Sequence, residues 1–248
     1  MKRKNIRHFF RLMIIMLLII TITGCGKTGS VPVQLDNENT ASDQNPVYAI
    51  ISIKDYGRMK FRLLDKYAPS AVSLFTDMAE KGYFDNKSIY MAIRDFCFIA
   101  GSASETEFNG QSLIVENDQT DTKTPCYPLK GALCFTEALG GGRYSAANFA
   151  VIHAGKDFLE ELEELLKYKK VTLAEYFKQA YGNEIKEEDL KVFRKYGGAP
   201  WIYGHCIVFG QLIEGEEVLD SICCTEVSDD SGFVPMEDII IESVTIEK

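Results

Sequence analysis

Short segments in which apolar and polar residues alternate recur from residue 47 to the end of the chain. The first two, residues 47–54 and 58–64, flank a turn that contains Gly57, and this arrangement is typical of a β-hairpin. Further short apolar segments, bounded by glycine or polar turns, stand at residues 88–93, 96–101, 131–136, 148–153, 206–213 and 238–247. Many short strands with few helices predict a mainly β fold that closes into an antiparallel barrel.

One amphipathic helix is predicted between the first hairpin and the next strand, over residues 68–81. Pro69 stands near its first turn, Gly82 follows its end, and one face carries Val72, Phe75, Met78 and Ala79. A shorter, charged helix is expected after the strand at residues 206–213. Two flanking helices beside so many strands again favour the closed barrel.

The first 24 residues have the pattern of an export signal. A basic start with five Lys or Arg residues precedes an apolar segment, residues 12–22, which is shorter than the roughly 20 residues that span a bilayer. Residues 22–25, Ile-Thr-Gly-Cys, resemble a bacterial lipobox, so Cys25 is expected to become the lipidated first residue of the mature chain. The alternative is an uncleaved signal anchor with an incidental cysteine. Two acyl chains on Cys25 would hold the protein stably on the outer face of the cytoplasmic membrane.

Residues 25–46 are rich in Gly, Ser, Asn and Asp without an apolar period, so they are expected to form a flexible tether. Residues 47–248 suffice for one domain with a sizeable core, and a monomer is expected. Loss of the signal segment would change the formal net charge from −9 to −14. Such an acidic surface argues against nucleic acid, or any other polyanion, as a partner.

Six cysteines remain when Cys25 is set aside, at positions 97, 126, 134, 206, 223 and 224. An even number permits disulfides in an exported protein, but a domain of this size does not need them, and small buried hydrophobic residues are the favoured interpretation. The Cys and His spacing does not indicate zinc, and no metal or cofactor is expected. His153, and Cys206 beside His205, lack the neighbours that a thiol nucleophile requires. His153 is therefore expected to be a polar residue at a strand end.

Six segments stand in a characteristic order and spacing: LLDKYAPSAVSLFTDMAEKGYFD, RDFCFIAGS, KGALCFTEA, SAANFAVIHA, PWIYGHCIVFGQLIEGEEVLDSI and PMEDIIIESVTI. Together they resemble the cyclophilin-type peptidyl-prolyl isomerases, over residues 47–246 apart from an insertion. The resemblance implies an eight-stranded barrel capped by two helices, with a proline-binding groove on one outer face. It also implies isomerase activity on prolyl peptide bonds.

The insertion runs from about Gly155 to Gly198, where the family has a short loop. Its apolar residues fall on three helix faces, which carry Phe158, Leu162, Leu165 and Leu166, then Leu173, Tyr176, Phe177, Ala180 and Tyr181, then Leu190 and Phe193. Two or three helices are therefore expected to pack onto the barrel. Their charged faces are interpreted as solvated surface, with an extension of the substrate cleft as the alternative.

Prolyl isomerisation is rotation about an amide against a barrier of about 18–20 kcal/mol, and it needs no nucleophile, base or metal. A protein lowers the barrier by holding the proline ring in an apolar pocket and pointing a donor, usually an arginine, at the prolyl nitrogen. The requirement is a groove with aromatic side chains and one arginine.

The resemblance keeps two of these features and changes four. The family's pocket Phe falls on Phe96 and its groove Trp on Trp201. The family's catalytic Arg falls on Met91 and its groove Gln on Ile99. Its second pocket Phe falls on Ala150 and its groove His on Cys206, and these four positions complete the expected site. The expected substrate-binding set adds Arg94, Arg143, Asn148, Phe149 and His205. Arg94, next to the pocket Phe, and Arg143, in the glycine-rich segment 139–148, are either replacement donors or solvated arginines.

The expected function is a lipid-anchored extracytoplasmic peptidyl-prolyl isomerase of reduced rate, which binds proline-containing segments of exported proteins and assists their folding. Because a groove without the arginine favours binding over turnover, a non-catalytic binding module on the same scaffold is the alternative. A structural lipoprotein with a vestigial groove is a third interpretation. Trp201 is expected at the groove rim opposite Phe96, since Pro200 and Gly204 place it in a turn and turns lie at the surface.

Overall fold

The computed structural model describes residues 45–117, 126–137, 143–228 and 232–248. The predicted signal segment, Cys25 and nearly all of the predicted tether lie outside the described residues, as do residues 139–142 of the glycine-rich segment. Within the described ranges, no helix is long and apolar enough to cross a membrane.

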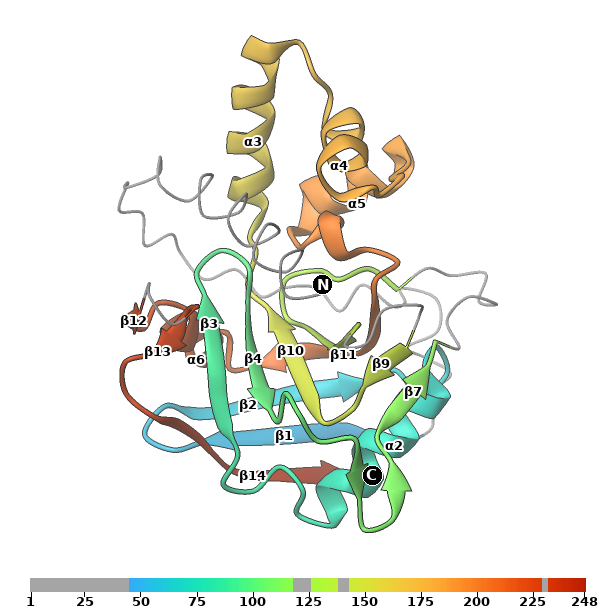
Figure 1. The fold of residues 1–248 in the computed structure, drawn as a ribbon, viewed down its shortest axis with the longest axis vertical. Coiled ribbons are helices and arrows are strands. Elements are labelled where there is room, and N and C mark those ends of the chain that lie inside the picture. Colours follow the sequence, from blue (N-terminus) through green and yellow to red (C-terminus); the bar gives the residue numbers. More distant parts are fainter. Residues whose placement is uncertain (1–44, 118–125, 138–142, 229–231) are drawn as a thin grey trace.

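Within the described residues, eight strands form a closed antiparallel barrel, which confirms the predicted fold (Figure 1). In spatial order they are β1 (Tyr48–Ile53), β14 (Ile239–Glu247), β3 (Ser88–Ile93), β4 (Cys97–Gly101), β10 (Asn148–Ile152), β8 (Ala132–Thr136), β11 (Cys206–Glu214) and β2 (Gly57–Leu63), and β2 pairs with β1. Short strand pairs add β5 (Glu107–Phe108) with β6 (Gln111–Ser112), β7 (Ile114–Glu116) with β9 (Arg143–Ser145), and β12 (Val227–Ser228) with β13 (Val234–Pro235). Each segment that the alternation predicts as a strand forms one strand of the barrel.

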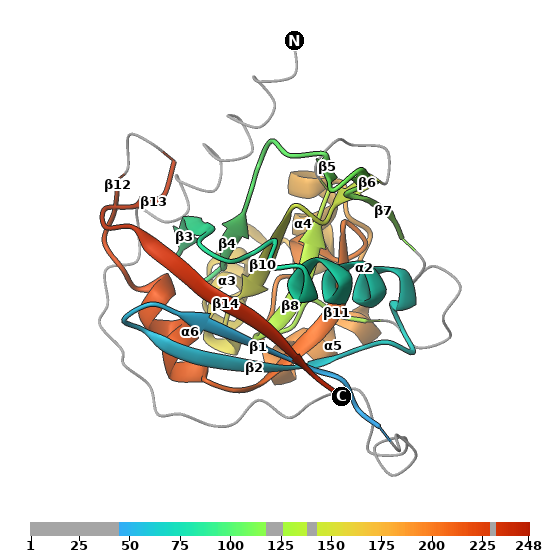
Figure 2. The same ribbon diagram turned by 90° about the horizontal axis from the view of Figure 1, so that it is seen from below.

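Side chains that point into the barrel form an interior core with one face of α2 (Pro69–Glu80). Phe75 of α2 lies among aromatic rings, with centroid distances of 5.0–6.5 Å to Phe209, Phe84, Phe149 and Phe135. Proline begins α2 and Gly82, with φ 71°, follows its C-cap, as the sequence predicts. The second capping helix is α6 (Glu216–Cys223), and Figure 2 shows α2 and α6 on opposite sides of the barrel.

The expectation that Phe149 contributes to substrate binding is wrong, because its side chain is 0% exposed inside the barrel. Its ring contacts those of Phe75, Phe84 and Phe98. Successive residues of a strand point to opposite faces, so this orientation places Ala150 on the outer face. The outer face therefore carries a methyl group where the family has a ring.

Three helices of the insertion stand on one end of the barrel, above the β3–β4 turn and the end of β10 (Figure 1). They are α3 (Lys156–Lys169), α4 (Leu173–Tyr181) and α5 (Glu187–Tyr196), and the 3-10 helix η2 (Pro200–Ile202) follows them. Their apolar faces cover outward-pointing residues of the strands, and the two sets form an outer core. It contains Cys97, Cys134, Ala150, Ile152, Cys206 and Val208 from the strands, Leu159, Leu162, Leu166, Leu173, Phe177, Leu190 and Phe193 from the insertion, and Trp201.

Polar contacts also fix the insertion to the barrel. Tyr127, before β8, donates its hydroxyl to Asp189 Oδ1 of α5 at 2.7 Å. Arg194 of α5 donates to Glu163 Oε1 of α3 at 2.7 Å and 3.0 Å. Gly198 is needed where the insertion rejoins the barrel, because its φ is 119° and a Cβ there would lie 2.4 Å from the Pro128 carbonyl oxygen. The insertion is therefore a packed part of the domain rather than a loose excursion.

Candidate functional site

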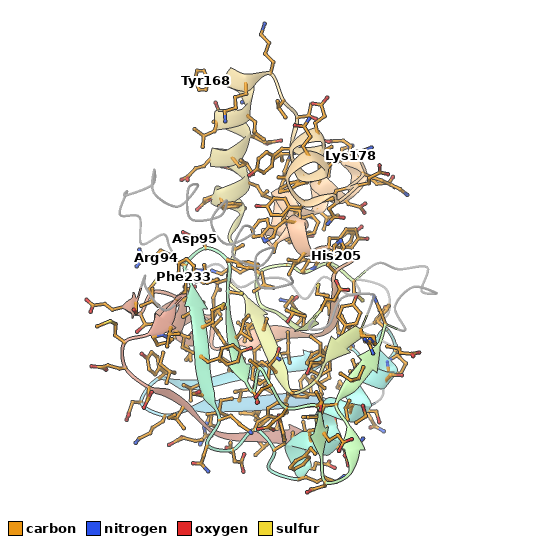
Figure 3. All side chains as sticks on the ribbon, in the orientation of Figure 1. Arg94, Asp95, Tyr168, Lys178, His205 and Phe233 are labelled. Carbon is orange, nitrogen blue, oxygen red and sulfur yellow. The ribbon has the colours of Figure 1, made fainter. Side chains whose placement is uncertain are left out.

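The β3–β4 turn presents Phe96 at the end of the barrel that the insertion covers. Phe96 N–H donates to the Ile93 carbonyl at 3.1 Å, which closes the turn, and Asp95 has φ 59° within it. Figure 3 shows Arg94 and Asp95 of this turn at the base of the insertion. The Phe96 ring is half-buried, so part of its surface remains open to a ligand.

Trp201 lies in η2 and is only 6% exposed, so the expectation that it stands at the groove rim is wrong. Its ring contacts Phe96 and Phe158 at centroid distances of 5.2 Å each and Phe177 at 6.4 Å. Phe158 and Phe177 belong to α3 and α4, so the insertion supplies the side chains that bury the indole. The expected proximity of Trp201 to Phe96 holds, but their rings touch and leave no space for a prolyl segment between them.

The indole Nε1 of Trp201 is buried and has no hydrogen-bond partner. An unpaired buried donor of this kind costs about 1–3 kcal/mol, which the surrounding apolar contacts must offset. The backbone around it is well held, because Asn183 Nδ2 donates to the carbonyls of Tyr203, Pro200 and Trp201 at 2.8, 3.2 and 3.4 Å. Sequence reasoning missed Asn183, since nothing near it indicates partners 17–20 residues away.

Three of the four changed positions stand in one row across the barrel. Met91 pairs with Ile99, Ile99 with Ala150, and the row continues through Cys134 to Val208. Directly paired residues of neighbouring strands share a face, so these side chains form one apolar stripe on the outer face. We call it the apolar row. Met91 and Ile99 are half-buried, whereas Ala150 is 1% exposed, so the open part of the row lies on β3 and β4, the two strands that the Phe96 turn joins.

Cys206 lies beside the apolar row and is 4% exposed. A hydrogen bond with Cys134, together with burial, raises the pKa of the Cys206 thiol. A raised pKa keeps the thiol protonated and unreactive, so the structure gives it no nucleophilic role. All six cysteines in the described residues are free; five are buried, as predicted, and Cys224 is exposed.

The candidate donors lie at the periphery of this site. Arg94 and Arg143 are both exposed. His205 is exposed too, with Nδ1 3.7 Å from Glu137 Oε2, and Figure 3 shows it across the base of the insertion from Arg94. Asn148 is 6% exposed and donates Nδ2 to the Ser102 carbonyl at 3.2 Å. Its amide joins β10 to the segment after β4, and its expected contact with substrate stays a prediction.

His153 connects three elements just behind the β3–β4 turn. Its ring Nδ1 accepts from Asp95 N–H at 3.1 Å, and its ring Nε2 lies 3.1 Å from Asp220 Oδ1 of α6. The backbone N–H of His153 donates to the Phe96 carbonyl at 2.7 Å. Lys130 Nζ lies 3.2 Å from the same carboxylate oxygen of Asp220. Burial and then the Lys130 charge lower the pKa of His153. The sequence predicted a polar residue at a strand end but gave no sign of this network.

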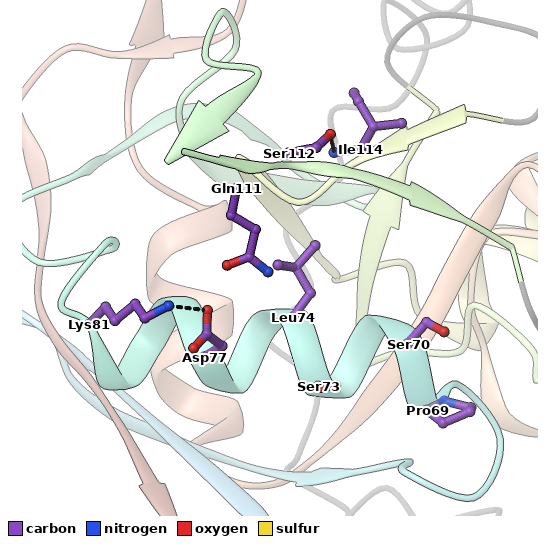
Figure 4. Close-up of a pocket in the computed structure, with 9 residues that line it drawn as sticks. All are labelled: Pro69, Ser70, Ser73, Leu74, Asp77, Lys81, Gln111, Ser112 and Ile114. Atoms are coloured by element: carbon purple, nitrogen blue, oxygen red, sulfur yellow. Dashed lines mark hydrogen bonds and ion pairs between the residues drawn. The ribbon is translucent and has the colours of Figure 1, made fainter. Parts of the chain in front are cut away.

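A separate cavity of about 690 Å³ opens between α2 and the β6–β7 segment (Figure 4). It is lined by Pro69, Ser70, Ser73, Leu74, Asp77, Lys81, Gln111, Ser112 and Ile114. Asp77 and Lys81 form an ion pair at 2.7 Å on its edge. Figure 1 places α2 and the insertion at opposite ends of the molecule. This largely polar cavity does not provide the apolar surroundings that a proline ring requires.

The comparisons with known proteins agree with this geometry. The family model for cyclophilin-type peptidyl-prolyl cis-trans isomerases matches residues 48–246. A Staphylococcus haemolyticus protein named "Putative peptidyl-prolyl cis-trans isomerase" is 29% identical over 191 residues, which cover 77% of this chain and 87% of that protein. A protein of the same name from Staphylococcus saprophyticus is 27% identical over 84% of this chain and 95% of its own length.

Solved structures give the same fold. A cyclophilin-type peptidyl-prolyl cis-trans isomerase of Cryptosporidium parvum, crystallised in the presence of the dipeptide Ala-Pro, superimposes with a TM-score of 0.56 at 18% identity. The match covers 81% of this chain and 99% of that one. The chain therefore belongs to the cyclophilin-type peptidyl-prolyl cis-trans isomerase family.

Proposed function

We propose that this chain is a lipid-anchored, extracytoplasmic peptidyl-prolyl cis-trans isomerase of modest rate, which acts on proline-containing segments of exported proteins. The observation that carries the proposal is the half-exposed Phe96 ring, which packs on Trp201 and belongs to the turn between the two strands that bear the open end of the apolar row. A proline ring packs favourably on such a surface, and the adjoining amide loses water there. Removal of water favours the less polar, twisted amide.

The modest rate follows from Met91, which stands at the position of the family's catalytic arginine. A thioether cannot donate to the prolyl nitrogen, and loss of one preorganised donor costs about 10²–10³ in rate. Arg94 belongs to the same turn as Phe96, but its side chain is exposed and must be ordered before it can act. The site therefore relies mainly on apolar packing and desolvation.

The location rests on the sequence of the first 25 residues. Their basic start, short apolar segment and lipobox-like Ile-Thr-Gly-Cys support export followed by lipidation of Cys25. Residues 26–46 then give the barrel a tether to the membrane surface. Cys25→Ala should block maturation or release the protein from membranes. A Cys25→Ala protein that still fractionates with membranes at mature length contradicts this part of the proposal.

A non-catalytic module that holds proline segments is the second candidate, favoured by the absence of a donor at Met91. Titration of X-Pro peptides followed by the fluorescence of Trp201, the only tryptophan, separates the two functions when combined with an isomerisation assay. Acceleration over a buffer blank at micromolar protein supports the enzyme. Saturable binding without acceleration selects the module. If neither binding nor acceleration is seen, both functions are rejected.

A further inference from the structure

We propose that His153, in its neutral form, is a positioning residue that holds Phe96 against Trp201, and that its protonation releases the β3–β4 turn. The proposal rests on the proposed role of Phe96 in binding the proline ring. It makes the site responsive to acid through a buried side chain that accepts from the backbone N–H of Asp95, the residue before Phe96.

The hydrogen bonds fix the protonation state of His153. Asp95 N–H can only donate, so the Nδ1 atom that it faces at 3.1 Å must present a lone pair. The ring proton then sits on Nε2 and is donated to Asp220 Oδ1 at 3.1 Å. The neutral Nε2–H tautomer is therefore the form that satisfies both partners.

The turn depends on these contacts because its backbone is strained. Asp95 has φ 59°, in the left-handed region that non-glycine residues rarely adopt. The Nδ1 bond to Asp95 restrains this residue, and the carbonyl of the next residue, Phe96, accepts from His153 N–H at 2.7 Å and Ala154 N–H at 3.2 Å. The His153 side chain and the backbone that follows β10 thus hold Asp95 and Phe96.

Charged groups from three elements face His153. Lys130, before β8, lies within ion-pair distance of Glu216 at 2.7 Å and Asp220 at 3.2 Å, both on α6, and Asp95 belongs to the turn. His153 is 8% exposed. Burial first and Lys130 second oppose a charge on the imidazole, whereas Asp220 and Asp95 favour it, and the net effect lowers its pKa below the ordinary value of 6.5. At neutral pH the turn is held.

Protonation reverses the role of Nδ1. A proton on Nδ1 would face the Asp95 N–H, and two donors cannot bond, so the restraint on the strained turn is lost. We expect the Phe96 ring to lose its fixed position on Trp201 when this happens. Loss of one neutral hydrogen bond changes an equilibrium constant by about two- to tenfold. We therefore expect kcat/KM for an X-Pro peptide to drop by about two- to tenfold.

The test uses the full chain and two readouts between pH 8 and pH 5: Trp201 emission and kcat/KM for an X-Pro peptide. Wild type should show one transition below pH 6.5 in both. His153→Gln, whose amide can accept from Asp95 and donate to Asp220, should remain folded by circular dichroism and lose the transition. Tyr168→Phe on α3, where the side chain is 88% exposed and lies outside the site, should keep it. Persistence of the transition in His153→Gln overturns the proposal.

Asp220→Asn keeps His153 and removes the carboxylate that favours its charge, so the transition should move to lower pH, and an unmoved transition also overturns the proposal. This variant serves if His153→Gln does not fold. Wild type without isomerase activity, but with an emission transition that depends on His153, rejects the proposed function and retains the positioning role. Isomerase activity in wild type, with a transition that persists in His153→Gln, supports the proposed function and rejects the positioning role.

Discussion

The ring of Phe96 packs directly on the ring of Trp201, with their centroids 5.2 Å apart and their planes inclined by 53°. The contact joins the β3–β4 turn to η2, two segments that lie about 100 residues apart in the chain. Because the contact is closed, the proposed function requires a proline ring to bind on the free surface of Phe96 and on Met91 and Ile99, not between the two aromatic rings. Trp201 supports the binding surface from behind.

Trp201→Ala should therefore behave as a core truncation. We expect it to lower the free energy of unfolding by about 3–5 kcal/mol, measured from the urea midpoint. Trp201→Phe should cost much less, since it keeps most of the apolar contact and removes the unpaired Nε1–H. Tyr168→Ala on α3, where the side chain is 88% exposed, is the control. A loss below about 1 kcal/mol in Trp201→Ala would show that the indole is not part of the core.

Met91→Arg tests whether the missing donor limits the rate. The arginine would stand next to Ile99 on β3 and β4, at the open end of the apolar row. We expect kcat/KM for X-Pro peptides to rise about tenfold or more, up to the 10²–10³ that one preorganised donor contributes. Met91→Leu, which adds no donor, should leave the rate within about twofold. Equal rates in both variants would place the limitation at the other changed positions, Ile99, Ala150 and Cys206.

Asn183→Ala tests how the insertion holds η2. The change removes the amide that donates to the carbonyls of Pro200, Trp201 and Tyr203, and leaves three buried acceptors with fewer partners. We expect a loss of about 1–3 kcal/mol and a red shift of Trp201 emission as water reaches the indole. Gln179→Ala, on the exposed face of α4, should change neither quantity. An unshifted emission spectrum in Asn183→Ala would argue that the aromatic contacts alone fix Trp201.

The stability of the protein should fall as the pH drops below 6.5, the ordinary pKa of histidine. The folded-state pKa of His153 lies below 6.5, so the unfolded chain takes up its proton first as the pH falls. The stability that neutral His153 contributes is present above pH 6.5 and is lost as the pH drops toward the folded-state value. Urea midpoints at several pH values measure this slope, and His153→Gln should make it flatter. A slope that is unchanged by the substitution contradicts the assignment.

The strands were predictable because alternation and glycine turns are local signals, and all eight segments form the barrel. The site was predictable only in part. The resemblance located Met91, Ile99 and Ala150, and strand pairing brings them together. It did not reveal that Phe149 points inward, because adjacent residues of a strand differ only in which face they occupy.

The burial of Trp201 could not be foreseen from its own turn. Pro200 and Gly204 do indicate a turn, but Phe158 and Phe177, which cover the indole, come from helices that begin up to 45 residues earlier. Likewise, His153 meets Asp220 across 67 residues, and no spacing rule relates them. The first of these contacts depends on how the insertion docks, and the second on how α6 packs against the barrel.

The most direct test of the account compares wild type with Phe96→Ala in an X-Pro isomerisation assay. Phe108→Ala is the matched control, because Phe108 is also half-buried but packs on Tyr83 at 4.8 Å, on β5 and away from the site. The account predicts acceleration by wild type and Phe108→Ala, and loss of at least about tenfold in Phe96→Ala, with folding of all three verified by circular dichroism. Equal acceleration by wild type and folded Phe96→Ala would contradict it.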